Sequence, residues 1–126
     1  MVTAKRVLIV DDDIGIRRIV QLTLNAIADW EVLLASSGSE GVAIAETELP
    51  DAILLDVMMP GMDGIETFIK MQANPNTKPI PIILLTAKTK VSEQQHFNNI
   101  AIAGVITKPF KAPQLVDQIC SILNWN

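Results

Sequence analysis

Charged and hydroxyl side chains directly follow several short apolar runs of this sequence, and their types could bind a cation and carry a phosphoryl group. They are Asp11, Asp12, Asp56, Thr86 and Lys108. Neighbouring carboxylates repel one another, and burying them is costly unless a positive group lies among them. If the fold brings these side chains together, we therefore expect a cation to join them.

The chemistry that suits such a set is phosphoryl transfer. Mg²⁺ takes oxygen ligands, usually one or two carboxylates plus waters, and leaves positions for phosphate oxygens. A carboxylate can attack phosphorus and form an aspartyl-phosphate. This transfer mainly needs positioning and neutralisation of the phosphoryl oxygens, which a cation and a lysine can supply. The residues thus predict Mg²⁺ as the cofactor of a site built from Asp11, Asp12 and Asp56, with Thr86 and Lys108 beside it.

The elements that must position these residues are short strands. Apolar runs with strand-like length and β-branched content are Arg6–Val10, Glu31–Ala35, Ala52–Leu55, Ile80–Leu85 and Gly104–Ile106. The segments between them have apolar residues at helical spacing. The expected faces are Ile16, Val20, Thr23, Leu24 and Ile27; Val42, Ala45 and Leu49; Ile65, Phe68, Ile69 and Gln72; and Leu115, Ile119, Ile122 and Leu123. The polar segment from about Val91 to Ile100 is assigned as the fourth helix because the last two strands need a connection.

This alternation predicts an α/β fold, a doubly wound five-stranded parallel sheet with five helices. In a flavodoxin-like strand order, 2-1-3-4-5, strands one and three are neighbours at the switch point. Asp11, Asp12 and Asp56 would then converge outside the carboxyl ends of the strands, where ligands bind in such sheets.

Composition excludes several other classes of protein. The chain has 126 residues, 49% hydrophobic and 19% charged, as expected for a single globular domain over residues 1–126 with no output domain. A net charge of −4 argues against direct nucleic-acid binding. The single cysteine, Cys120, forms no internal disulfide, and no apolar run approaches membrane-spanning length. We expect a cytoplasmic protein without membrane insertion.

Four motifs together resemble the receiver domain of two-component response regulators, of the stand-alone, chemotaxis-receiver-like kind. They are VLIVDDD, DAILLDVMMPGMDG, ILLTAK and ITKPF, in this order, and the resemblance extends from about Lys5 to Leu123. It implies that Asp56 accepts a phosphoryl group from a phosphohistidine of a sensor kinase or a phosphotransfer protein. It also implies that the chain is not an enzyme but a phosphoacceptor that promotes its own phosphorylation and dephosphorylation.

The resemblance implies a role for each site residue. Asp12 and Asp56, with the backbone carbonyl of Met58, would hold Mg²⁺, and Asp11 would act directly or through water. Lys108 would pair with the phosphoryl oxygens, its bond to the following proline being typically cis in this family. The Thr86 hydroxyl would move towards those oxygens. This movement would repack the face made by helix four, strand five and helix five, and the repacked face would serve partner binding or a phosphorelay.

The chain departs from the family pattern at its switch and tuning positions. Val105 stands where the family usually has an aromatic residue, so its usual readout cannot operate in the same form. The segment AIAG has only Gly104 at a turn where a Gly-Ala pair is common. Met58 and Lys88 occupy the two variable positions that tune hydrolysis in this family, and Ala87, directly before Lys88, is a further expected switch or tuning residue. Neither Met58 nor Lys88 suits the alignment of an attacking water, which predicts a long-lived phosphoryl group.

Other functions fit the residues less well. A phosphatase with an aspartate nucleophile needs a second acid where this chain has Met58, and a nucleotide-binding module needs a Gly-, Ser- or Thr-rich first loop. A receiver-like module that binds partners without phosphorylation stays open as the alternative. The downstream target is not identified by the sequence, and we expect a monomer or a weak dimer.

Several residues near these motifs have ordinary structural explanations. Asp13 is expected to cap the first helix. Arg17 and Arg18 are expected to be solvated on that helix, although family members dock their phosphodonor there. Cys120 is expected to pack in the core, and Trp125 to be an exposed residue of the chain end.

Overall fold

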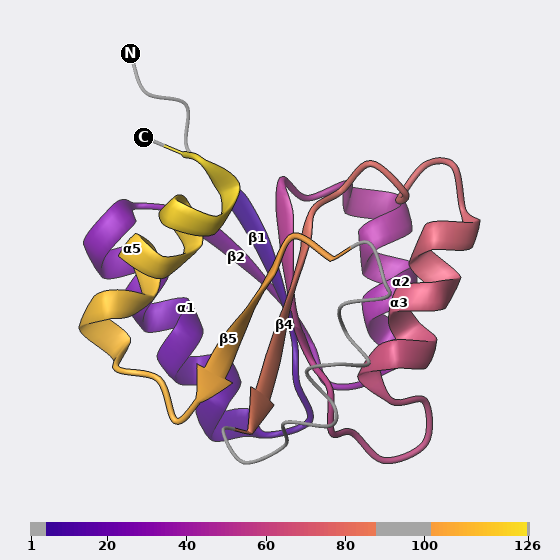
Figure 1. Ribbon diagram of the computed structural model, residues 1–126, viewed down its shortest axis with the longest axis horizontal. Coiled ribbons are helices and arrows are strands. Elements are labelled where there is room, and N and C mark those ends of the chain that lie inside the picture. The colour runs from indigo at the N-terminus through magenta and orange to yellow at the C-terminus, as the bar shows by residue number, and fades with distance from the viewer. Residues whose placement is uncertain (1–4, 88–101, 126) are drawn as a thin grey trace.

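The computed structural model describes residues 5–87 and 102–125. Its strands form one parallel five-stranded sheet in the order β2-β1-β3-β4-β5 (Figure 1). In chain order the elements are β1 (Arg6–Val10), α1 (Ile14–Ala28), β2 (Glu31–Ala35), α2 (Gly38–Glu48), β3 (Ala52–Asp56), α3 (Gly64–Ala73), β4 (Ile82–Ala87), β5 (Gly104–Lys108) and α5 (Ala112–Leu123). The predicted strand order and fold class are confirmed.

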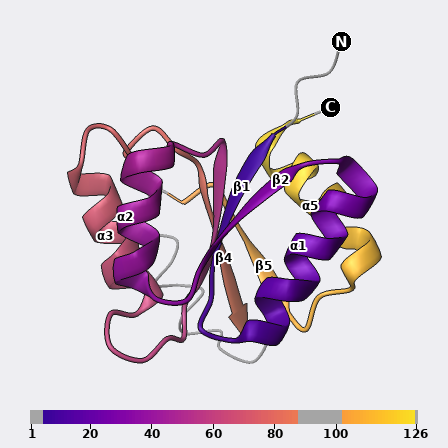
Figure 2. The same ribbon diagram turned by 180° about the vertical axis from the view of Figure 1, so that it is seen from behind.

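Helices cover both faces of the sheet. Helices α1 and α5 lie on one face, and α2 and α3 lie on the other (Figures 1 and 2). Each face has its own apolar core, because side chains alternate between the two sides of a strand. Leu8 and Leu55 belong to the core under α2 and α3, whereas Ile9 and Leu54 belong to the core under α1 and α5. Burial on both faces explains the nearly continuous apolar strands.

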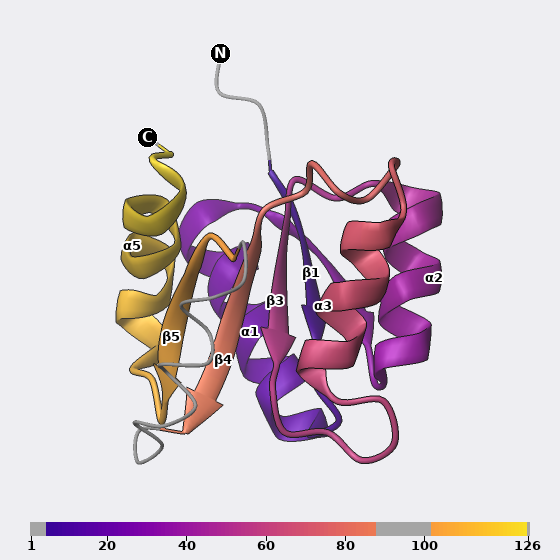
Figure 3. The same cartoon turned by 45° about the vertical axis from the view of Figure 1, so that its right-hand side comes forward.

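The register of the sheet brings the carboxyl ends of the strands to one edge. Val10 of β1 pairs with Ala35 and Leu55, the last apolar residues of β2 and β3. Ala87 of β4 pairs with Lys108 of β5. In Figure 3 the strand arrows point to this edge, from which the loops to α1 and α3 leave. Residues that directly follow the apolar part of a strand are therefore gathered at one place.

Polar side chains cap the starts of α1, α2 and α3. Asp13 caps α1, accepting hydrogen bonds from the backbone N–H groups of Gly15 and Ile16, so its predicted capping role is confirmed. Ser37 caps α2, and Asp63 caps α3. These caps stabilise helix starts that lie close to the carboxyl ends of the strands.

The structure corrects several boundaries and faces. Strands β3 and β5 extend to Asp56 and Lys108, and β4 runs from Ile82 to Ala87. Three side chains expected on buried helix faces are exposed instead: Ile27, Leu49 and Ile69. The buried stripe of α1 follows Val20 and Leu24, which leaves Ile27 outside it, and Leu49 lies beyond the last residue of α2 with a φ of 47°. The expected fourth helix lies outside the described residues.

Helices long and apolar enough to cross a membrane are absent from the two described ranges.

Candidate functional site

Three carboxylates converge at the carboxyl edge of the sheet. Asp11 and Asp12 follow β1, and Asp56 ends the adjacent strand β3. One carboxylate oxygen of each lies within 4.8 Å of those of the other two. Asp11 is fully buried and Asp56 is 4% exposed, whereas Asp12 is exposed to solvent. The expected meeting of these three residues is observed.

Asp11 is held by contacts to both its backbone and its carboxylate. Its N–H donates to the carbonyl of Ala35 over 3.1 Å. Its Oδ1 accepts from the backbone N–H of Asp13 at 2.9 Å, and its Oδ2 accepts from Lys108 Nζ at 2.9 Å. A buried carboxylate thus has its oxygens satisfied, and its position relative to β2 and β5 is defined.

Lys108 joins two of the acids. Its Nζ lies 2.9 Å from Asp11 Oδ2 and 3.2 Å from Asp56 Oδ1. The lysine is the last residue of β5, two strands away from Asp56 in the sheet. The peptide bond between Lys108 and Pro109 is cis, as expected. The structure therefore places an ammonium group directly between the ends of β1 and β3.

Burial and neighbouring charges shift the pKa values of Asp56 and Lys108. The pKa of Asp56 is raised to about 6: burial and then the neighbouring Asp11 carboxylate raise it, and they outweigh Lys108 and the Met58 N–H, which lower it. Burial lowers the pKa of Lys108, but its hydrogen bond to Asp11 and the negative charges of Asp11 and Asp56 outweigh burial and raise it. The single positive charge of Lys108 thus does not fully balance the negative charges of the ionised carboxylates.

The donor set fits a hard divalent cation. Asp11, Asp12 and Asp56 offer oxygen ligands from one compact group, and one side of the group is open because Asp12 is exposed. Within the described ranges the salt bridges bring only the Lys108 ammonium to this group. A divalent cation would offset the remaining negative charge, and carboxylates with waters are the ligands that Mg²⁺ prefers.

The loop that follows Asp56 returns closely to it. The Met58 N–H donates to Asp56 Oδ1 over 3.3 Å, and the Met58 side chain is exposed. Gly64 opens α3, and its N–H donates to the Val57 carbonyl. A Cβ at Gly64 would collide with the Asp56 carbonyl and lie 2.7 Å from the Val57 Cα. Position 64 therefore requires glycine, because any side chain there would collide with the backbone of Asp56 and Val57.

Thr86 on β4 directly follows Leu85, the residue that pairs with Asp56. It is 2% exposed, and its hydroxyl is the one buried side-chain polar atom without a hydrogen-bond partner within the described residues. Ala87 ends the same strand, while Lys88 falls outside the part of the chain that the structure describes. A buried hydroxyl without a partner has unused capacity to bind a polar group.

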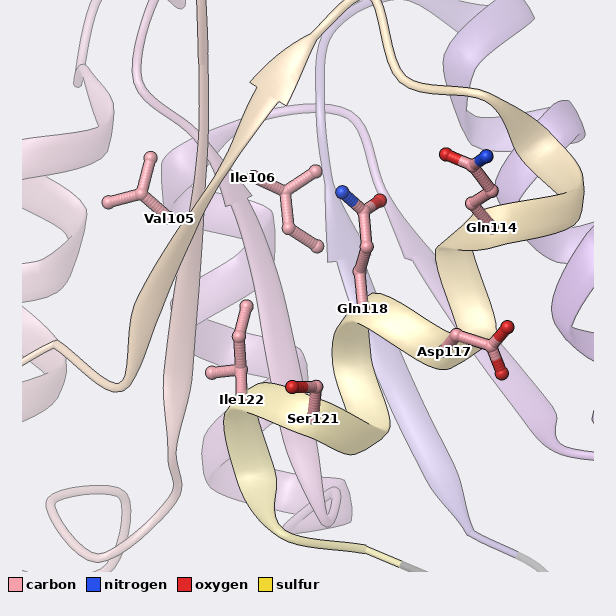
Figure 4. Close-up of a pocket in the computed structure, with 7 residues that line it drawn as sticks. All are labelled: Val105, Ile106, Gln114, Asp117, Gln118, Ser121 and Ile122. Carbon is pink, nitrogen blue, oxygen red and sulfur yellow. The ribbon is translucent and has the colours of Figure 1, made fainter.

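Val105 and its neighbour Ile106 point to opposite sides of β5 (Figure 4). Val105 packs against the core under α2 and α3, and Ile106 belongs to the core under α1 and α5. Both residues line a pocket between β5 and α5, whose other lining residues are Gln114, Asp117, Gln118, Ser121 and Ile122. The branched aliphatic side chain at position 105 is thus half-buried at the edge of the sheet.

Two residues, Arg17 and Trp125, form contacts that the sequence did not indicate. Arg17, expected to be solvated, is half-buried, and its Nη1 donates to the Asp11 carbonyl over 2.7 Å. Its position one turn into α1, after the acids, was the only sequence signal for this contact. Trp125, expected to be exposed, packs edge-to-face on the buried Trp30 with ring centroids 5.3 Å apart, and Lys5 Nζ lies 4.8 Å from the centroid of the Trp125 ring.

Cys120 packs against the α1–α5 core, as predicted.

Comparisons with known proteins agree with this geometry. The model of the response regulator receiver domain family matches residues 7–120. The chain is 33% identical to the structure of the Vibrio cholerae chemotaxis protein CheY4, with a TM-score of 0.87 and coverage of 95% of this chain and 99% of that one. It is 25% identical to the receiver domain of the Pseudomonas aeruginosa sensor histidine kinase PA1611, with a TM-score of 0.85 and coverage of 97% and 99%. That structure has a magnesium ion coordinated in its active site cleft.

Among curated proteins, the chain is 36% identical over 119 residues to the phosphate regulon transcriptional regulatory protein PhoB of Pseudomonas aeruginosa. The alignment covers 94% of this chain and 52% of PhoB, so the chain spans about half the length of that relative. The family match, the strand order and the acidic site agree with one another. The chain therefore belongs to the response regulator receiver domain family of two-component signalling.

Proposed function

We propose that this receiver accepts a phosphoryl group on Asp56 in a Mg²⁺-dependent reaction and thereby switches a partner-binding face. The observation that carries the proposal is the position of the Asp56 carboxylate, which lies within reach of Asp11, Asp12 and Lys108 at one edge of the sheet. The chain acts as a phosphoacceptor that promotes its own phosphorylation and dephosphorylation, rather than as an enzyme with a separate substrate.

In the proposed step, a carboxylate oxygen of Asp56 attacks the phosphorus of a phosphohistidine. A P–O bond forms, the P–N bond breaks, and the leaving histidine nitrogen retains the electron pair and takes up a proton. Lys108 contributes positive charge to the transferred oxygens, since its ammonium is already beside Asp56. Asp11, Asp12, Asp56 and the Met58 carbonyl would hold Mg²⁺, which would further neutralise the charge of the phosphoryl oxygens.

Protonation decides whether Asp56 can act as the nucleophile. Its pKa of about 6 leaves it ionised at neutral pH, and a bound divalent cation would favour the ionised form further. The Lys108 ammonium, whose pKa is raised, keeps its charge over the same range. The pair thus has the protonation states that carboxylate attack requires.

The Thr86 hydroxyl gives the proposed switch its physical basis. It is buried and lacks a partner within the described residues, so a phosphoryl oxygen on Asp56 would offer it a hydrogen bond. A shift of this side chain would alter packing near β5, where Val105 and the pocket towards α5 lie (Figure 4). We propose that a partner protein reads this face through aliphatic and amide groups instead of an aromatic side chain.

The proposed phosphodonor is a sensor histidine kinase or a histidine phosphotransfer protein. Helix α1 begins beside the acids, and Ile14, Ile19 and Leu22 on it are 63%, 46% and 67% exposed. Ile19 and Leu22 are three residues apart and so are neighbours on the surface of α1, as in an interaction surface. An α-helical donor packed on α1 would bring its phosphohistidine to the open side of the site.

The test is intact mass after incubation with a small phosphoramidate and Mg²⁺, with Asp56→Asn as the matched control. A single phosphoryl adduct that needs Mg²⁺ and is absent from the variant is the expected result. Loss of the adduct should be slow, because Met58 offers no group that aligns an attacking water. If the native protein binds Mg²⁺ but forms no adduct, the receiver instead binds its partner without phosphorylation.

A further inference from the structure

The Arg17 side chain contacts the peptide group that joins Asp11 and Asp12 in the β1–α1 loop. Its Nη1 lies 2.7 Å from the Asp11 carbonyl oxygen, and that carbonyl belongs to the peptide between Asp11 and Asp12. The arginine is half-buried, whereas Arg18 beside it is exposed. A short hydrogen bond from a charged donor at a half-buried position restrains the acceptor strongly.

The restraint acts where the loop is otherwise least constrained. The Asp11 side chain is fixed by Asp13 and Lys108. The Asp12 side chain is exposed, and within residues 5–87 and 102–125 it forms no salt bridge. The direction of the Asp12 carboxylate therefore depends on the orientation of the peptide before it, which Arg17 holds.

We infer that Arg17 is a positioning residue of the cation site. Its guanidinium sets the Asp11–Asp12 peptide so that the Asp12 carboxylate faces Asp11 and Asp56 without rearrangement when a divalent cation binds. The inference rests on the proposed Mg²⁺ site and adds a residue that touches neither the cation nor the phosphoryl group. Groups that orient metal ligands in this way commonly change metal affinity about ten- to hundredfold.

The two ways in which Arg17 could affect Mg²⁺ have opposite signs, and this makes the inference testable. A guanidinium that acted only through its charge would repel the cation, so its removal would tighten Mg²⁺ binding. A guanidinium that positions Asp12 would, on removal, leave the carboxylate to adopt other directions, and binding would weaken. The sign of the change in affinity decides between them.

The experiment is a calorimetric Mg²⁺ titration of the native protein, Arg17→Met and Arg18→Met. Met keeps most of the apolar stem of arginine, so packing on α1 is largely preserved. We expect the Mg²⁺ dissociation constant of Arg17→Met to rise about tenfold. Arg18→Met removes the same charge from an exposed neighbour and should stay within about twofold of the native value. An unchanged or tighter dissociation constant for Arg17→Met would overturn the inference.

If Arg17→Met does not fold, the more conservative variant Arg17→Lys tests whether Arg17 positions Asp12. Arg17→Lys keeps the charge but replaces the planar fork with a shorter, compact donor. A weakening of Mg²⁺ binding by about tenfold, the lower end of such effects, supports positioning, and an unchanged dissociation constant overturns it. Far-UV circular dichroism establishes which variants are folded.

Phosphorylation provides a second readout that a purely structural defect would not reproduce. With a small phosphoramidate, Arg17→Met should need about tenfold more Mg²⁺ for half-maximal rate. Its rate at saturating Mg²⁺ should stay within about threefold of the native one, since Asp56 and Lys108 are unchanged. A lower saturating rate with an unchanged Mg²⁺ requirement would contradict the inference. If the native protein itself binds no Mg²⁺, the proposed cation site fails, and the two failures are thereby distinguished.

Discussion

Lys108 Nζ lies 2.9 Å from Asp11 Oδ2, an ion pair that connects the last residue of β5 with the residue directly after β1. The aspartate is fully buried and the lysine side chain is 24% exposed. The same ammonium contacts Asp56 at 3.2 Å. Much of the charge balance of the site in its metal-free state therefore depends on one side chain.

Replacing this lysine should destabilise the metal-free protein. Lys108→Met leaves two buried carboxylates without their cation, and loss of one partner from a buried pair costs about 3 kcal/mol. The free energy of unfolding from urea titration in the presence of a chelator measures the effect. Excess Mg²⁺ should recover part of the loss, because a cation can replace the missing positive charge.

Lys70→Met is the matched control for this experiment. Lys70 is exposed on α3, and its replacement should change the free energy of unfolding by less than about 0.5 kcal/mol. Equal losses in the two variants would contradict the role given to Lys108.

The raised pKa of Asp56 predicts a pH-dependent stability. The folded protein holds the Asp56 proton up to about pH 6, whereas the unfolded chain releases it near 3.8. Between these values the folded state binds more protons, so the stability of the metal-free protein falls as pH rises, by at most about 3 kcal/mol. The contribution is present below the unfolded pKa and is lost through the folded one.

Asp56→Asn tests this directly, because the amide has nearly the same shape and does not ionise. In chelator at about pH 8 the variant should be about 1–3 kcal/mol more stable than the native protein, as measured by urea unfolding. The difference should shrink towards zero near pH 4, where about all of Asp56 is protonated. A constant difference between the two proteins at all pH values would show that Asp56 does not titrate as inferred.

Mg²⁺ affinity should depend on the same proton. Below pH 6 the cation must displace the proton of Asp56, so the apparent dissociation constant should rise by about tenfold for each further pH unit. Calorimetry in buffers with different ionisation enthalpies would also report proton release on binding. The Asp56→Asn variant should bind more weakly and with a flatter pH profile, and an equally steep profile would point to another titrating group.

The contact between Trp125 and Trp30 should contribute to stability and not to the site. Trp125→Ala removes an edge-to-face aromatic pair and the contact with Lys5, at a cost of about 1–3 kcal/mol. Urea unfolding measures the loss, and the Mg²⁺ dissociation constant should be unchanged. An unaltered unfolding free energy would mean that the aromatic contact does not persist in solution.

Much of the site followed from local sequence signals. Four of the five apolar runs in the sequence lead into a charged or hydroxyl residue, so a parallel sheet must gather Asp11, Asp56, Thr86 and Lys108 at one edge. Asp13 was predictable as a cap because the hydrogen bonds of a helix start are local. Strand order and fold class rest on the same alternation.

The remaining features depend on which surfaces meet in three dimensions. Helical periodicity predicts which face of a helix is apolar, but not how much of that face other elements cover. Ile27 and Ile69 are exposed because neighbouring elements do not cover them. Arg17 binds Asp11 because the start of α1 brings its guanidinium to the Asp11 carbonyl. Trp125 covers Trp30 because α5 packs against α1. The sequence by itself determined the helices and strands and the residues at their ends. The tertiary structure decided the contacts between distant elements, because these contacts depend on relative orientations that no local sequence pattern encodes.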